Sequence, residues 1–115
     1  MAQYATEKQV RFRLKDFNQK QFESNVIDEA INRASGMIDS HLCNFYSTAD
    51  LSSSIQIINH ICVDLAASYA IGTSFQDYDQ ASSTWESKLH NMSMQMLRTI
   101  QDGIAHVPGV ARIGV

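Results

Sequence analysis

The stretch from residue 24 to residue 46 constrains the fold most, because its apolar residues recur at helical spacing for about six turns. A strand alternates every second residue and cannot give this pattern. Ser24 or Asn25 is expected to cap the start, and Asp28 is expected in the first turn, where a carboxylate suits the positive end of a helix. We therefore predict one long amphipathic helix whose core face is formed by Ile27, Ala30, Ile31, Ala34, Ile38, Leu42 and Phe45.

Three further stretches have helical patterns. Thr6 and Gln9 have the spacing of a capping box, which predicts a short helix over residues 6–14. Residues 55–72 are apolar on nearly every side, which predicts a central helix ended by Gly72. An apolar stripe predicts a fourth helix over residues 78–105. The predicted fold is all-α: a short N-terminal helix plus three longer helices packed as a small bundle.

The C-terminal residues have a different character. Pro108 cannot continue a helix, so we predict a helical domain over residues 1–106 followed by an extended C-terminal tail over residues 107–115. Nothing obvious covers the apolar residues of this tail, which predicts either a frayed segment or an arm added to a partner's surface. These residues are Val107, Val110 and Ile113.

Large and sulfur-containing side chains indicate the core. Trp85 is the largest single candidate for burial. Cys43 and Cys62 each lie in a predicted helix and are expected to be reduced and buried. The fourth helix carries three closely spaced methionines, which suit either core packing or a contact between subunits: Met92, Met94 and Met96.

The net charge of −3 is unevenly distributed. Up to Lys20 there are five basic and two acidic residues, and the remainder has four basic and ten acidic residues. This asymmetry indicates polar self-association or one electrostatically selected partner, and it is too weak for wrapping nucleic acid. The basic face of the short helix is interpreted as solvated or protein-facing, with nucleic-acid contact as the alternative: Lys8, Arg11, Arg13 and Lys15.

The length of 115 residues predicts one domain. The sequence has no apolar run of about 18 residues, so no membrane span is expected. The first residues are too polar for a secretory signal, so we expect the chain to stay in the compartment where it is made.

No catalytic or metal-binding pattern is apparent in the sequence. His41 with Cys43, and His60 with Cys62, are each two residues apart and point about 200° away from each other on a helix, so neither pair can chelate one ion. A site using one member of each pair stays open. Asp39 and Asp64 lie in apolar helices, where they either face one another or are single hydrogen-bonded positions. With no phosphate-cradling loop, HExxH or GxSxG, we expect no enzyme, no metal and no cofactor.

The run from Ile27 to Leu42, followed by Phe45-Tyr46, resembles the pattern "I..AI..AS..ID.YL...Y". This is the signature helix of the head–tail connector (adaptor, or head-completion) proteins of tailed phages, including the Mu-like prophage type. The similarity extends over roughly residues 4–105. It includes the opening Tyr4-Ala5-Thr6, the run Asp64-Leu65-Ala66 with Tyr69-Ala70, and the helix that contains Tyr78 and Trp85 and closes at Gly103. Family members often have an arginine before the tyrosine and a proline soon after it, whereas this chain has Phe45 and then Ser47-Thr48-Ala49.

The resemblance implies a structural virion subunit without enzymatic activity or cofactor. Copies would assemble in the bacterial host cytoplasm into a roughly twelve-fold ring under the portal protein, at the head–tail junction. The ring would extend the channel for double-stranded DNA and dock the tail or the next completion protein. A negative lumen would let DNA slide, and Asp77, Asp79 and Glu86 are the residues predicted to face it. The alternative is a small helical regulator that binds nucleic acid through the basic N-terminal helix.

Overall fold

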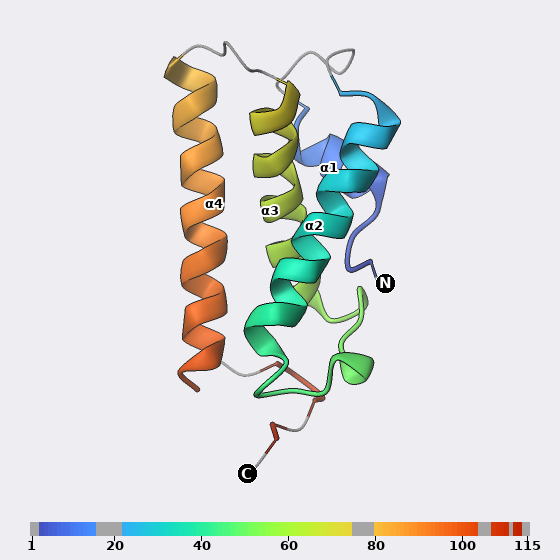
Figure 1. The fold of residues 1–115 in the computed structure, drawn as a ribbon, viewed down its shortest axis with the longest axis vertical. Helices are drawn as coiled ribbons and strands as arrows, with labels where there is room; N and C mark the ends of the chain where they lie inside the picture. The colour runs from blue at the N-terminus through green and yellow to red at the C-terminus, as the bar shows by residue number, and fades with distance from the viewer. Residues whose placement is uncertain (1–2, 16–21, 75–79, 104–106, 111, 114–115) are drawn as a thin grey trace.

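The computed structural model describes residues 3–15, 22–74, 80–103, 107–110 and 112–113, with the side chains of residues 74 and 80–85 left aside. It contains four α-helices, α1 (Glu7–Arg13), α2 (Ser24–Leu42), α3 (Gln56–Ser74) and α4 (Gln80–Gln101), and a 3-10 helix η2 (Thr48–Asp50) (Figure 1). The described residues contain no strand. The predicted all-α fold is therefore confirmed.

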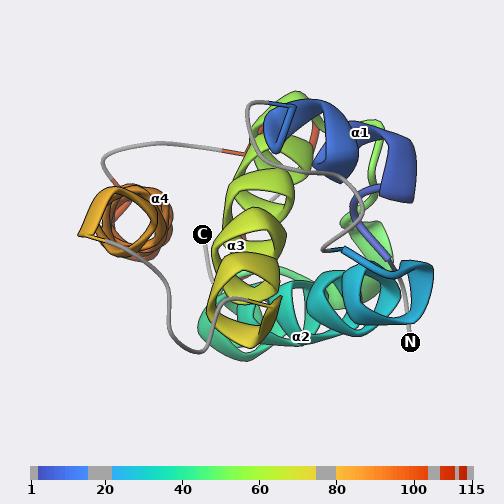
Figure 2. The ribbon, with the colours of Figure 1, turned by 90° about the horizontal axis from the view of Figure 1, so that it is seen from above.

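Helix α3 is the central element. It packs against α1, α2 and α4, which surround it on different sides (Figure 2). Its predicted central position follows from its composition, since apolar side chains on several faces need neighbours on several sides. The residues of α3 buried in these contacts are Ile58, Ile61, Cys62, Leu65, Ala66, Ala67, Ala70 and Ile71.

Helix α2 buries the predicted face from Ile27 to Leu42. Its ends differ from the prediction. Glu23 is the N-cap residue and makes no side-chain cap hydrogen bond, and the first turn holds no acidic residue, so Asp28 lies further along the helix. The helix ends at Leu42, so that Phe45 is only partly buried, and Cys43 is exposed rather than buried.

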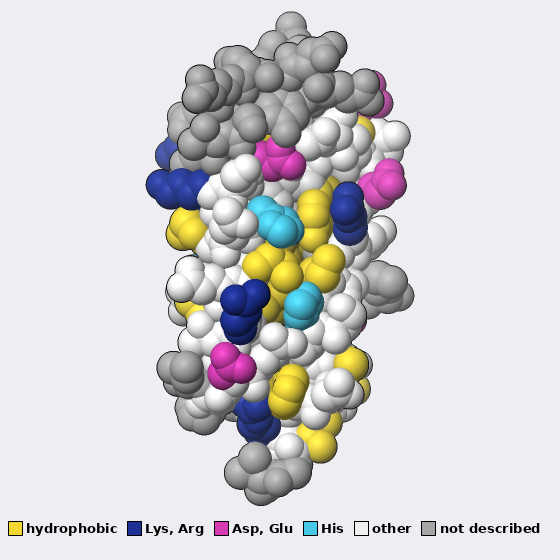
Figure 3. Space-filling view, turned by 60° about the vertical axis from the view of Figure 1, so that its left-hand side comes forward, with side chains coloured by type: hydrophobic (Ala, Val, Ile, Leu, Met, Phe, Trp, Pro, Cys, Tyr) yellow, Lys and Arg dark blue, Asp and Glu magenta, His cyan; other side chains and the backbone are white. Residues whose placement is uncertain are grey.

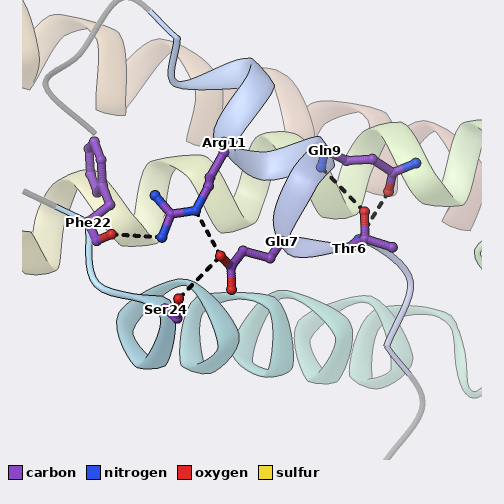
Figure 4. A network of polar contacts seen from close by, with 6 residues as sticks. All are labelled: Thr6, Glu7, Gln9, Arg11, Phe22 and Ser24. Atoms are coloured by element: carbon purple, nitrogen blue, oxygen red, sulfur yellow. Dashed lines mark hydrogen bonds and ion pairs between the residues drawn. The ribbon is translucent and has the colours of Figure 1, made fainter. Parts of the chain in front are cut away.

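Helix α1 begins as predicted. The Gln9 N–H donates to Thr6 Oγ1 at 3.3 Å and the Thr6 N–H donates to Gln9 Oε1 at 3.0 Å, which completes the capping box (Figure 4). Arg11 then links α1 to the start of α2, because its guanidinium donates to Glu7 Oε2 at 2.8 Å and to the Phe22 carbonyl at 2.9 Å. The Ser24 hydroxyl donates to the same Glu7 oxygen instead of capping its own helix.

The last two helices have different bounds from those predicted. Helix α3 continues through Gly72 to Ser74, and α4 ends at Gln101, before the predicted end at residue 105. The predicted start at residue 78 lies outside the described residues. Of the two interpretations of the methionines, core packing was wrong for Met92 and Met96, which are 49% and 40% exposed. The side chain of Trp85 lies outside the described part of the chain.

Val107 and Val110 lie against the bundle, so the prediction that nothing covers the C-terminal apolar residues was wrong for these two, whereas Ile113 is exposed. Val107 is 2% exposed and belongs to the core, and Val110 packs against that core. A turn joins the two valines: the Val110 N–H donates to the Val107 carbonyl, and Gly109 has a φ of 78°, a value that glycine adopts without strain. The division of the chain at residue 107 stays a prediction.

In the described part of the chain, no helix combines the length and apolar character needed to cross a membrane.

Candidate functional site

Two adjoining hollows lie along α3. One, of about 920 Å³, lies between α1 and α3, and the other, of about 420 Å³, lies between α3 and α4. His60 and Asp64 line both hollows, so we treat them as one surface and name it the α3 groove. Its other lining residues include Lys8, Arg11, Phe12 and Arg13 of α1, Lys15 just after α1, Ile57 and Val63 of α3, Met92 and Met96 of α4, and Pro108.

The bed of the α3 groove is apolar. Phe12 is 70% exposed, and Met92 and Met96 are also exposed. Ile57, Ile61 and Val63 of α3 line the same hollows. Large apolar side chains gathered on an open surface are typical of a protein contact. From the sequence, the methionines were considered by themselves, and only the fold brings Met92 and Met96 to the same groove as Phe12.

The rim of the groove is basic. All four predicted basic residues line it, and among the described residues Asp64 is the one acid that lines the hollow between α1 and α3. Arg13 donates to Asp64 Oδ1 at 2.9 Å, and the hydrogen bond from Arg11 lowers the pKa of Glu7. Lys8 is exposed, and the Lys15 ammonium lies 4.9 Å from the centre of the Phe12 ring. Two of the four bases are thus held by acids of this chain, and Lys8 and Lys15 extend to solvent.

Met94 does not belong to the groove. It is partly buried against the core, because it lies two residues from Met92 and from Met96 and therefore points to another side of α4. Figure 3 views the molecule from the α4 side, where hydrophobic side chains are gathered among histidine and basic ones. Of the three methionines, Met92 and Met96 therefore line the groove, and Met94 is partly buried against the core.

A smaller polar pocket of about 440 Å³ lies between α2, α3 and α4. Arg33 stacks over the Tyr69 ring at 4.3 Å, and His90 meets the same ring edge-on. The buried Tyr69 hydroxyl has no hydrogen-bond partner among the described residues, and burial raises the pKa of Tyr69. Glu86 lines this pocket, whereas Asp77 and Asp79, the other residues predicted to face a channel, lie outside the described residues.

The predicted tail contacts also separate. Val107 is in the core, Val110 is partly buried, and Ile113 is 53% exposed. Arg112, which the sequence reasoning missed, holds this segment: its guanidinium donates to the Ile100 carbonyl at 2.9 Å and to the Gln101 carbonyl, and it stacks over the Phe45 ring at 4.6 Å. No spacing rule links Arg112 to residues 11 and 12 positions earlier, so only tertiary structure reveals it.

No three His, Cys, Asp or Glu side chains in the described part of the chain are grouped as metal ligands. Asp39 accepts a hydrogen bond from the Tyr4 hydroxyl and Asp64 pairs with Arg13, so both are single hydrogen-bonded positions. The arrangement is that of a binding surface: an apolar bed with a basic rim on the central helix of a small bundle.

The model of the family described as Bacteriophage Mu, Gp36 matches residues 1–112. A search of curated proteins and a search of solved structures each gave no match. Because the family match covers nearly the whole chain, this protein belongs to the bacteriophage Mu Gp36 family, a family of phage proteins.

Proposed function

We propose that this chain is a structural subunit of the phage head–tail connector. In this proposal, copies form a roughly twelve-fold ring under the portal protein, and the ring docks the tail or the next completion protein. The role is non-catalytic, needs no cofactor and places the protein at the head–tail junction of the virion, after assembly in the host cytoplasm.

The observation that carries the proposal is the open apolar groove on a member of a phage protein family. A chain of 115 residues that leaves Phe12, Met92 and Met96 exposed around its central helix is suited to being covered by other subunits. The helix pattern over residues 27–46 adds the resemblance to connector proteins.

The acidic residues contribute a second part of the proposal. Asp77, Asp79 and Glu86 face the channel in the proposed ring, where negative charge repels DNA and lets it pass without sticking. The basic residues of α1 are better suited to a protein contact than to DNA, because Arg11 and Arg13 are already paired with Glu7 and Asp64.

A deletion of the gene in its phage tests the proposal. The deletion should give DNA-filled heads and free tails that do not join, and the purified protein added to such lysates should restore infectious particles. Antibody labelling of complemented virions should mark the head–tail junction. Normal virions from the deletion strain, or labelling elsewhere on the particle, would contradict the connector role.

A further inference from the structure

We propose that the α3 groove of one copy binds the exposed acidic start of α2 of the next copy. We name this second surface the acidic α2 face and define it by Glu23, Asp28 and Glu29, all of which are exposed. The inference rests on the proposed ring and assigns the two surfaces through which its subunits meet.

Charge complementarity is the first argument. Among the described residues, the groove is lined by four bases and one acid, Asp64, whereas the acidic α2 face presents three carboxylates. The four bases are Lys8, Arg11, Arg13 and Lys15. Lys8 and Lys15 are the exposed members of the basic set. Exposed charges interact over a screening length of about 8 Å at physiological salt, so these two surfaces attract only when they are brought close together. The same surfaces on two copies repel when like meets like, which favours groove-to-α2 contact over symmetric pairing.

The positions of the two surfaces provide the second argument. Helix α2 lies along one side of α3, and the corner between α1 and α4 that holds the groove lies on the other side (Figure 2). The groove and the acidic α2 face are two different surfaces of one subunit, so a contact between them is head-to-tail. Such contacts close into a ring when the rotation between subunits permits it.

The groove's bed is suited to a protein helix rather than to nucleic acid. Exposed Met92 and Met96 can adapt to the shape of a partner, and Phe12 offers an aromatic contact beside the cations. On the acidic α2 face, half-buried Val26 lies next to the carboxylates and supplies an apolar contact. The test below includes nucleic-acid binding in the groove as the competing outcome.

Charge reversal tests the inference on the full-length chain. The variants are Lys8→Glu with Lys15→Glu, and Asp28→Lys with Glu29→Lys. Sedimentation velocity over a concentration series should show assembly of the wild-type protein, weakened at least about tenfold in each variant alone. An equimolar mixture of the two variants should recover assembly, because each groove then meets an α2 face of opposite charge. Circular dichroism checks that every variant is folded.

A matched control carries the same charge change elsewhere. Asp50→Lys with Asp102→Lys alters two exposed acids outside both surfaces and should assemble like the wild-type protein. A wild-type chain that stays monomeric at every concentration, variants that assemble normally, or a mixture that does not recover would each overturn the inference. The inference would also be overturned if the Lys8→Glu, Lys15→Glu variant lost binding to a DNA fragment that the wild-type protein binds, while its self-association stayed unchanged. Rings that persist in the variants overturn this interface alone, while the deletion phage decides the connector role separately.

Discussion

At the scale of single residues, Tyr4 ties the N-terminal segment to the bundle. Its hydroxyl donates to Asp39 of α2, its N–H donates to Ser35 Oγ at 3.2 Å, and its carbonyl accepts from Asn59 Nδ2 of α3 at 2.9 Å. Burial, together with the hydrogen bond to Asp39, raises the pKa of Tyr4. Tyr4 therefore fixes the approach to α1 through both its backbone and its side chain, and with it the position of the groove's basic rim.

Replacing Tyr4 with phenylalanine tests this contact through pH. The folded chain keeps the Tyr4 proton to higher pH than the unfolded chain, so wild-type stability falls as pH rises above about 10. The Tyr4→Phe variant should be about 1–3 kcal/mol less stable at pH 7, because Asp39 loses its donor, and should lose less stability between pH 9 and about 11. Urea unfolding across this range measures both, and parallel pH curves for the two proteins would refute the assignment.

The partners of the two partly buried aspartates, Asp39 and Asp64, could not be predicted from the sequence. Asp39 and Asp64 were considered as residues that could face one another, but Asp39 binds Tyr4 and Asp64 binds Arg13. These partners are 35 and 51 positions away in the sequence, and helical periodicity gives no information about contacts between residues so far apart. The Thr6–Gln9 capping box was predicted because it is complete within four residues.

At the scale of helices, interiors were predictable and ends were not. The apolar face of α2 follows from local spacing, whereas its end at Leu42 is set by where the chain turns toward buried Tyr46. Gly72 does not end α3, because packing against α2 and α4 outweighs the modest helix cost of glycine. Arg112, from the segment after α4, donates a hydrogen bond to the Ile100 carbonyl at the end of that helix. It lies close to Gly103, where an added Cβ would be 3.3 Å from Arg112 Nη1.

Arg112→Ala should destabilise the chain through the end of α4. The change removes two charge-assisted hydrogen bonds to helix-terminal carbonyls and the contact with Phe45, at a cost of about 1–3 kcal/mol. Thermal unfolding monitored by circular dichroism measures it.

Arg98→Ala serves as the control, because it removes an exposed base from the same last turn and should cost less than about 1 kcal/mol. Equal losses in the two variants would mean that Arg112 acts only through its charge.

At the scale of the whole molecule, α3 packs against the other three α-helices, and part of its surface stays open along the α3 groove. The basic rim and the exposed methionines come from helices far apart in the sequence, so a single groove was not predictable from either pattern alone. The sequence-based interpretation of Val107 as an uncovered arm was wrong for the same reason, since its cover comes from the assembled core.

Phe12→Ser should separate stability from association. Because Phe12 is 70% exposed, its loss should change the free energy of unfolding by less than about 0.5 kcal/mol. In the proposed ring the same change removes an apolar contact from the groove and should weaken self-association in sedimentation experiments. Leu65→Ala, in the centre of α3, should do the opposite by lowering stability about 2–5 kcal/mol. A Phe12→Ser protein that assembles like wild type would exclude Phe12 from the interface.

The two cysteines differ in exposure, so the native chain offers a single reactive thiol to which a dye can be attached. Cys43 is exposed at the end of α2, while Cys62 is buried in α3 and its pKa is raised by burial. A maleimide dye should therefore attach at one position in the folded protein, with the second thiol reacting only after the bundle opens. Mass spectrometry of the labelling time course would count both steps, and simultaneous reaction of the two thiols would contradict this placement. A fluorophore on the natural sulfur can then follow subunit docking without any engineered substitution.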